Sequence, residues 1–227
     1  MMVSYKQHVH LKEFLFTKPF KWTLLFYLLK HQKMNRKLFS VLLFSFSLGL
    51  GSANAQNFAR KVNTLIGTDY TGNTYPGAQA PFGMVQLSPD NGLPGWDRIA
   101  GYFYPDSTIA GFSHTHLSGT GAGDLYDISY LPATKPFSIG EEPLGLHSKF
   151  SHKDETAYAG YYQVRLQDYD INVELTATPR CGVQRYTFPK NGKERYVVLN
   201  LAKAMNWDAT KNSAITLVDS FTIEGYR

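Results

Sequence analysis

The stretch from Gly160 to Phe188 reads GYYQVRLQDYDINVELTATPRCGVQRYTF, and this part of the sequence decides the fold. Apolar residues stand at every second position in it, first at Tyr162, Val164 and Leu166 and then at Ile171, Val173, Leu175 and Ala177. A period of two is typical of a β-strand with one buried face. A third strand is predicted from the alternation that we place on Val183, Tyr186 and Phe188.

A turn signal follows this stretch. Residues 189–193 read PKNGK and separate Arg185–Phe188 from the apolar run Tyr196–Leu201. Asn-Gly between two β segments is a strong hairpin signal, so we predict that these two strands pair directly. Short strands at about ten-residue spacing are typical of an antiparallel sandwich. The fold class is therefore predicted to be all-β, an antiparallel β-sandwich.

The segments on either side of this stretch carry fewer strand signals. Residues 57–135 are broken by glycine and proline, and we predict strands at Met84–Leu87 and Ile128–Leu131 with a turn at Ser88–Gly92. Near the C-terminus, Ile215–Val218 and Phe221–Ile223 are predicted strands. The sequence stops soon after them without a turn or a polar tail, so we expect the chain to be the N-terminal part of something longer.

The charge of the chain is unevenly distributed. The 227 residues hold 23 Lys+Arg and 18 Asp+Glu, but residues 1–55 contain eight of the basic residues and one acid, Glu13. Residues 56–227 therefore hold 15 basic and 17 acidic residues, without a basic run that could follow a phosphate backbone. Binding of nucleic acid is not expected.

The N-terminal 55 residues have the pattern of a leader. Residues 34–55 combine a positive start at Arg36 and Lys37, an apolar run from Leu38 to Leu50 and the cleavage motif Ala53-Asn54-Ala55, which predicts a signal peptide. The apolar run is shorter than the ~20 residues of a spanning helix, so no stable membrane span is expected. We interpret residues 1–33 as the product of an upstream start codon; a short membrane-associated helix is the alternative. The mature domain, 56–227, is expected to be periplasmic or extracellular.

Two histidines lie in GFSHTHLSGTGAGDLYD, residues 111–127. If Gly111–Leu117 is a strand, His114 and His116 share one face and could bind zinc with Asp124 or Asp127. No His or Cys follows downstream at ligand spacing, so one core or hydrogen-bonded histidine and one surface histidine are the favoured interpretation. The glycine loop is not expected to bind phosphate, because Leu125–Leu131 reads as a strand and not as a helix N-terminus.

A second group of interest is Gly95-Trp96-Asp97, which is followed by the aromatic run Gly101–Tyr104. Sugars bind with an aromatic face under their C–H surface and with carboxylates or amides on their hydroxyls. Most aromatic residues fill a core instead. The surrounding glycines favour a pocket, because glycine lets the backbone approach a ligand closely.

Together these segments resemble a known family. Val62–Asp90 (VNTLIGTDYTGNTYPGAQAPFGMVQLSPD), Gly95–Asp97, Gly101–Tyr102 and Gly111–Ile128, with Gly160–Phe188 further on, are similar to the N-terminal domain of glycoside hydrolase family 92, the exo-acting α-mannosidases. The match covers nearly all of residues 60–200 in family order. At Gln184 the sequence departs from the family's pattern, in which a histidine often stands.

The resemblance implies a two-part enzyme. Its N-terminal β-sandwich is of the galactose-mutarotase-like type, a supersandwich, and is normally followed by an α/α toroid that carries the catalytic acid and base. The family is calcium-dependent, inverts the anomeric centre and releases mannose from α-mannosides of glycans, many of them α-1,2-linked. Inversion needs two carboxyls roughly 6.5–9.5 Å apart. No catalytic residue is therefore expected in this chain, and most calcium ligands are expected outside it.

By the same resemblance, Trp96, Asp97, His114 and His116 are expected to form part of the sugar site or to support it. The mannose-containing glycan and the α/α domain are the expected partners. Two other functions stay open, a free-standing exported carbohydrate-binding sandwich and a mutarotase-like epimerase, because a fold does not fix a function.

Overall fold

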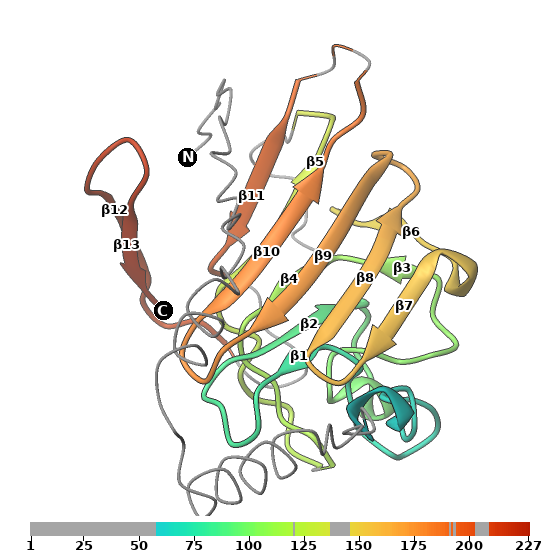
Figure 1. Cartoon of the computed structure of the whole chain (residues 1–227). Helices are drawn as coiled ribbons and strands as arrows, with labels where there is room; N and C mark the ends of the chain where they lie inside the picture. Colours follow the sequence, from blue (N-terminus) through green and yellow to red (C-terminus); the bar gives the residue numbers. More distant parts are fainter. Residues whose placement is uncertain (1–57, 120, 137–145, 191, 193, 203–208) are drawn as a thin grey trace, which may run out of the picture. The chain divides into compact units, whose positions relative to one another are not determined.

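Two antiparallel sheets face each other and form a β-sandwich, as the sequence predicts (Figure 1). The structure is a computed structural model and describes residues 58–119, 121–136, 146–190, 192, 194–202 and 209–227. One sheet has five strands in the order β1-β2-β4-β5-β11, and the other has four in the order β10-β9-β8-β7. The signal peptide predicted at 34–55 and the segment 1–33 lie outside the described residues.

The strands are short, as expected for a sandwich of this size. The five-stranded sheet contains β1 (Ala78–Gln79), β2 (Gln86–Asp90), β4 (Gly111–Ser113), β5 (Ser129–Ala133) and β11 (Tyr196–Asn200). The four-stranded sheet contains β7 (Glu155–Tyr158), β8 (Tyr161–Leu166), β9 (Ile171–Ala177) and β10 (Gly182–Thr187). Two small pairs are β3 (Thr108–Ile109) with β6 (Ser148–Lys149), and β12 (Ala214–Leu217) with β13 (Ile223–Tyr226). Within the described ranges the helical elements are three short 3-10 helices, η1 (Phe58–Lys61), η2 (Trp96–Arg98) and η4 (His152–Asp154).

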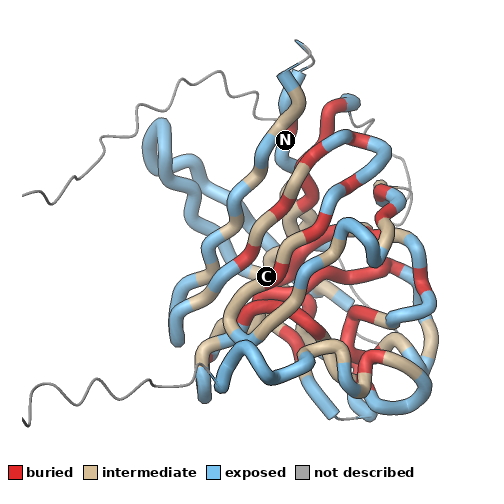
Figure 2. The backbone as a smooth tube through the Cα atoms, turned by 45° about the vertical axis from the view of Figure 1, so that its right-hand side comes forward, coloured by how far each residue is buried: buried red, intermediate tan, exposed pale blue. Residues whose placement is uncertain are grey.

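The core lies between the two sheets, and the period-two pattern identified the part of it that β8 and β9 contribute. The alternating residues of β8 and β9 are at most 1% exposed: Tyr162, Val164, Leu166, Ile171, Val173 and Leu175. They pack with residues of the facing sheet, including Leu87, Phe112 and Leu131. Each buried aliphatic side chain of this kind stabilises the fold by about 1.5–3 kcal/mol. In Figure 2 the buried stretches concentrate on these inner strands.

The predicted hairpin around Asn-Gly is wrong. β10 pairs with β9 at the edge of one sheet, whereas β11 pairs with β5 at the edge of the other, so residues 188–195 connect the two sheets. Eight residues are too many for a two-residue Asn-Gly hairpin loop. Val183 is also placed wrongly, since its side chain is 53% exposed and the half-buried positions of β10 are Gly182, Gln184 and Tyr186.

β2 also differs from the prediction, because it begins at Gln86 and continues through Pro89 to Asp90, where we expected a turn. A proline in a central strand removes one ladder hydrogen bond. Here β1 pairs with β2 only at Gln86 and Leu87, so Pro89 has no strand on that side that requires its missing N–H. The strand therefore accommodates the proline and carries Asp90 into the interior.

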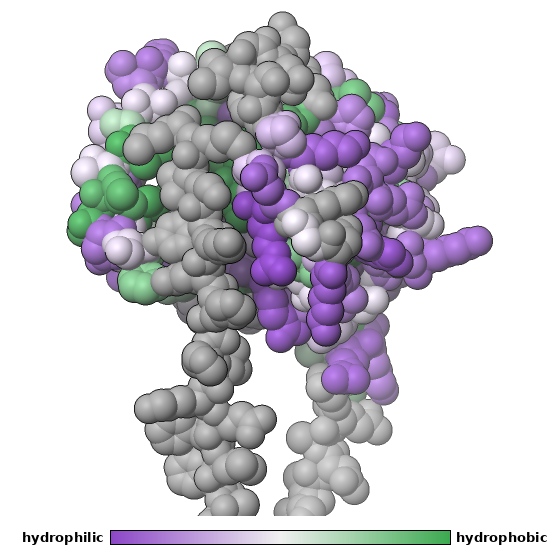
Figure 3. All heavy atoms as spheres, turned by 90° about the horizontal axis from the view of Figure 1, so that it is seen from above, coloured by the Kyte–Doolittle hydropathy of each residue, from purple (hydrophilic) through white to green (hydrophobic). Residues whose placement is uncertain are grey.

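The β12–β13 hairpin confirms the strand predicted at Ile215–Val218, but its second strand begins only at Ile223, so Phe221 and Thr222 lie in the connection and not in the strand that we predicted there. The hairpin is exposed along its whole length (Figure 2). Figure 3 shows apolar side chains gathered on this side of the molecule, where Ile215, Leu217 and Phe221 are 41%, 54% and 79% exposed. An apolar groove of about 500 Å³ separates the hairpin from β5 and β11.

Two further features bear on later sections. The turn between β9 and β10 contains the exposed Cys181, and the carbonyl of Pro179 accepts a hydrogen bond from the N–H of Met84 at 2.7 Å. Among the described residues, no helix has the length and apolarity that crossing a membrane requires.

Candidate functional site

Trp96 and Asp97 lie at the start of η2, in the connection that follows β2. Trp96 is 57% exposed and Asp97 is exposed, so neither belongs to the core. Gly95 precedes them with a φ of 153°, a backbone conformation that residues other than glycine rarely adopt. The indole therefore presents an accessible aromatic face, which is what stacking on a sugar ring requires.

Arg98, the last residue of η2, anchors this loop. Its Nε and Nη2 donate to the two carboxylate oxygens of Asp106 at 2.7 and 2.6 Å, and the guanidinium lies 4.5 Å from the ring centre of Phe103. The hydrogen bonds to Asp106 raise the pKa of Arg98 above its ordinary value, against the opposing effect of burial. A two-pronged contact with a nearly buried carboxylate restricts the loop strongly.

His116 is a buried residue of the interior. Its Nδ1 lies 2.7 Å from the carbonyl oxygen of Gln86, and its Nε2 lies 2.8 Å from Oδ1 of Asp90 and 3.1 Å from Oγ of Ser113. The side chains of His116 and Asp90 are both 0% exposed. Although Ser, His and Asp meet here, the serine and the aspartate contact the same ring nitrogen, so the group lacks the relay geometry of a hydrolytic triad.

His114 occupies a different place, half-buried against β10. Its Nδ1 donates to the carbonyl oxygen of Ile128 at 2.9 Å, and its ring packs edge-on against Tyr130. Gly182 makes room for the imidazole, since a Cβ there would lie 2.7 Å from Cδ2 of His114. Burial lowers the pKa of His114 and outweighs the hydrogen bond to Ile128. His116 is the core or hydrogen-bonded histidine that the sequence predicts, but the prediction of a surface histidine is wrong, because His114 is half-buried and hydrogen-bonded.

The shared strand face that the zinc hypothesis needs is absent. β4 ends at Ser113, before either histidine, and their ring nitrogens contact different groups. Among the described residues no three His, Cys, Asp or Glu side chains form a group that could hold a metal ion.

The glycine loop, residues 118–124, contacts two other loops. The N–H of Gly119 donates to the carbonyl oxygen of Asn73 at 2.6 Å, and a Cβ at Gly121 would lie 3.2 Å from the Trp96 ring. The chain after this loop is not the strand that we predicted from Leu125: Leu125, Tyr126 and Ile128 have φ values of 80°, 61° and 57°, and β5 begins at Ser129. Left-handed residues other than glycine are costly and concentrate at functional sites.

Asn73 is a residue that sequence reasoning missed. It has a φ of 49°, is 8% exposed, and its Oδ1 is buried without a hydrogen-bond partner among the described residues. The tight turn around it depends on Gly72, where a Cβ would lie 2.3 Å from the carbonyl oxygen of Gly67. A Gly-Asn pair between polar residues was the available signal, since asparagine tolerates the left-handed conformation.

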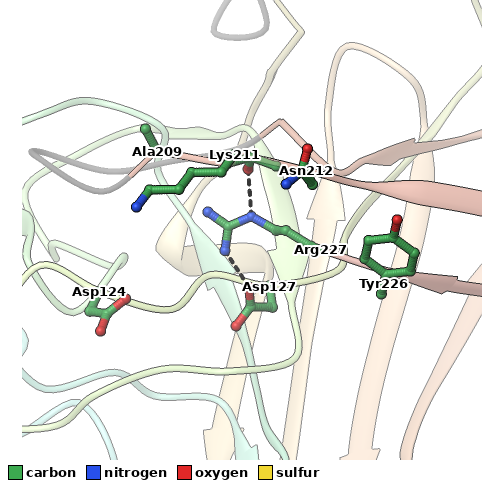
Figure 4. A pocket seen from close by; sticks show the side chains of 8 residues that line it. Asp124, Asp127, Ala209, Lys211, Asn212, Tyr226 and Arg227 are labelled. Atoms are coloured by element: carbon green, nitrogen blue, oxygen red, sulfur yellow. Dashed lines mark hydrogen bonds and ion pairs between the residues drawn. The ribbon is translucent and has the colours of Figure 1, made fainter.

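A polar pocket of about 370 Å³ lies beside Asp124 and Asp127, at the end of the glycine loop (Figure 4). Arg227 crosses it and bonds to Asp127 and to Oγ1 of Thr210, while Asp127 also accepts a hydrogen bond from Thr115. Asp124, Lys211 and Asn212 complete its polar lining. Carboxylates, cations and an amide in one pocket suit a ligand with many hydroxyl groups better than a single ion.

Comparison with known proteins identifies the family. Residues 61–227 match the model of the glycosyl hydrolase family 92 N-terminal domain. A family GH92 α-mannosidase from Bacteroides thetaiotaomicron, solved in complex with mannoimidazole, superposes with a TM-score of 0.70 and 35% identity over 75% of this chain and 23% of that one. A GH92 inverting mannosidase of the same organism superposes with a TM-score of 0.52 and 31% identity over 63% and 19%.

A further relative is an uncharacterized secreted glycosidase of Arthroderma benhamiae, 29% identical over 70% of this chain and 21% of its own length. The chain thus spans about a fifth of each of these proteins. The match to the family model, which covers most of the sequence and all of the sandwich, shows that this chain belongs to glycosyl hydrolase family 92 and carries its N-terminal domain.

Proposed function

We propose that this chain is the N-terminal, pocket-contributing domain of a secreted, calcium-dependent, inverting exo-α-mannosidase that acts on α-mannosides of glycans, α-1,2-linked ones first. Membership of the glycosidase family supports the reaction class, and the solved relatives are named α-mannosidases. The chain covers only 23% of the first of them, so we assign the activity to a longer protein of which this domain is one part.

One observation carries the proposal, the meeting of three loops around Trp96. The turn with Asn73, the exposed indole and the glycine loop come together through the Gly119–Asn73 hydrogen bond and the close approach of Gly121 to the ring. The indole face would stack on the C–H surface of a mannose ring. The exposed carboxylate of Asp97 would accept hydrogen bonds from sugar hydroxyls, whereas the buried Asn73 would shape the turn beside them.

Hydrolysis itself is assigned to the part of the enzyme that this chain does not include. We propose that the acid, the base and most calcium ligands lie in an α/α domain that packs beside these loops. Calcium, when bound there, would hold sugar hydroxyls through its flexible oxygen shell. The residues of this chain would bind and orient the glycan and keep water away from the aromatic face.

Export is supported by two observations. Residues 34–55 have the three parts of a signal peptide, and the relative from Arthroderma benhamiae is named a secreted glycosidase. We propose that the mature protein acts outside the cytoplasm.

The test uses the full-length enzyme and Trp96→Ala. Loss of a stacking face should lower kcat/KM for α-1,2-mannobiose by ten- to a hundredfold, since a stacked ring contributes on the order of 1–3 kcal/mol. Because Trp96 is exposed, the free energy of unfolding should change by less than about 0.5 kcal/mol. A matched control is Phe58→Ala, an exposed aromatic residue outside these loops. If the Trp96→Ala protein is unfolded, Trp96 contributes to the stability of the fold and the proposed role in sugar binding is contradicted.

The isolated domain distinguishes the proposed function from the main alternative, a free-standing carbohydrate-binding domain. Residues 56–227 alone should release no mannose, with or without calcium. If they bind mannobiose and the gene encodes nothing further, the free-standing carbohydrate-binding domain is the correct function; release of mannose by them would overturn the division of labour proposed here.

A further inference from the structure

Two loops of the candidate site begin at the same buried point. The loop that carries Trp96 leaves β2 after Asp90 and returns at Gly101, where the N–H of Asn91 donates to the carbonyl oxygen of Gly101 at 2.8 Å. The glycine loop begins directly after His116. The contact between Asp90 and His116 therefore joins the bases of both loops, 2.8 Å apart at Oδ1 and Nε2.

The two loops meet again at their far ends. Gly121 lies against the Trp96 ring so closely that a Cβ would be 3.2 Å from it. At the base, Gly101 packs on the pair: a Cβ there would lie 2.5 Å from Oδ1 of Asp90 and 3.2 Å from Cδ2 of His116. The loops and the pair thus form a closed ring of contacts.

The hydrogen-bond chemistry of the pair fixes the number of protons. Because the carbonyl oxygen of Gln86 can only accept, Nδ1 of His116 must donate to it. A neutral imidazole would then present a bare Nε2 to an ionised Asp90, and two acceptors 2.8 Å apart repel each other. One proton must therefore lie between Nε2 and Oδ1, on either atom.

The surroundings keep this proton from water. Both side chains are 0% exposed, and the rings of Tyr75 and Tyr126 lie 5.0 and 5.6 Å from the imidazole. Ser113 contacts the same nitrogen from β4 at 3.1 Å. In a buried site of low dielectric a satisfied contact of this kind is strong, and removing one partner costs the hydrogen bond that joins the bases of the two loops.

We propose that Asp90 and His116 form a proton-sharing clamp that sets the position of Trp96 for sugar binding. Both act through the loops as positioning residues and touch no substrate. The clamp itself follows from the described contacts, whereas its use in sugar binding rests on the function proposed above.

The first test measures the environment of Trp96 in residues 56–227 with Trp207→Phe, which leaves a single tryptophan, at the low protein concentration that fluorescence allows and that limits aggregation of the isolated domain. Asp90→Ala removes the contact, so Trp96 emission should shift to the red and become more accessible to acrylamide. Asp90→Asn should restore the native spectrum, because its amide can donate to a neutral Nε2. Ser88→Ala is the matched control, a buried residue of the same strand whose Oγ has no partner among the described residues.

A second measurement holds even if Asp90→Ala fails to fold. In the protein with ¹⁵N-labelled histidine, the clamp predicts a deshielded, slowly exchanging proton at Nε2 of His116 or Oδ1 of Asp90, and Asp90→Asn should abolish that signal. Its absence from the wild-type protein would overturn the clamp, and so would a folded Asp90→Ala protein with an unchanged Trp96 spectrum.

The sugar-binding role is tested separately with full-length Asp90→Ala and Asp90→Asn. Asp90→Ala should raise KM for mannobiose by about tenfold with a smaller effect on kcat, and Asp90→Asn should recover it. If Trp96 moves as expected but neither KM changes, the clamp holds and its use in sugar binding fails. Failure of the proposed function would appear differently, as full activity of Trp96→Ala.

Discussion

At the scale of single residues, the side chains around the candidate site differ in how much the sequence could say about them. The glycines around Trp96 favoured a pocket over a place in the core, and its 57% exposure excludes the core, while its part in a sugar pocket stays a prediction. Asp90 and His116 are 26 residues apart in the sequence. A pattern of residue types does not show which distant residues meet in space, so this contact could not be predicted. Asn73 gave a turn signal, but only the structure shows that its side-chain oxygen is buried without a partner.

His114 gives a prediction about acid stability. Burial lowers the pKa of its imidazole from an ordinary value of 6.5, so the unfolded chain takes up a proton at a higher pH than the folded chain. The stability that His114 contributes is therefore present above about pH 6.5 and is lost as the pH falls below it.

The measurement is the midpoint of thermal unfolding of the full-length enzyme at pH 7.5 and pH 5, for the wild type and for His114→Asn. The asparagine amide can replace the donor to the Ile128 carbonyl without taking up a proton. We expect the wild type to lose more stability on acidification than the variant. His147→Asn, at an exposed histidine, is the control, and an equal pH dependence of all three proteins would contradict the prediction.

At the scale of elements, the two strands with a strict period of two were predicted correctly, whereas the hairpin predicted from a turn signal was not. β8 and β9 are found where Tyr162–Leu166 and Ile171–Ala177 alternate, because each buries one face. The pairing of β10 and β11 was wrong, since Asn-Gly favours a tight turn but cannot exclude a longer connection between sheets. Pro89 led to a wrong prediction of a turn. The missing N–H of a proline weakens a strand only where a neighbouring strand lies on that side, and none lies there beside Pro89.

The β12–β13 hairpin gives a prediction about solubility. An isolated two-stranded hairpin is marginally stable, and this one exposes apolar side chains on both strands. Phe221→Ser should raise the solubility of the described domain without lowering its free energy of unfolding, because Phe221 is 79% exposed. The experiment compares light scattering at increasing protein concentration. Phe58→Ser, at a 66% exposed residue of η1, should have a smaller effect; equal effects would show that the hairpin is not the cause.

At the scale of the whole molecule, the proposed division of the enzyme predicts how the domain behaves alone. Several large apolar side chains of its loops are strongly exposed, among them Ile66, Tyr70, Phe82 and Met84. Residues 56–227 should therefore aggregate when expressed alone and become soluble when co-expressed with the proposed α/α domain. A soluble monomer that unfolds cooperatively would instead favour the free-standing binding domain.

The proposed export predicts the start of the mature protein. Cleavage after Ala55 leaves Gln56 as the first residue. N-terminal sequencing of protein from the exported fraction should read Gln-Asn-Phe-Ala. Protein in that fraction that still begins at Met1 or Met34 would be incompatible with cleavage.

The turn that holds Cys181 has a practical consequence for such experiments. It is the only cysteine of the chain, it is exposed, and its turn is tied to the loop of Phe82 and Met84 through the Pro179–Met84 hydrogen bond. A maleimide dye therefore attaches at one defined position beside an apolar surface, without any engineered thiol. Quenching or polarisation of that dye would report directly when another domain covers this surface, and the label leaves the Trp96 loops unmodified.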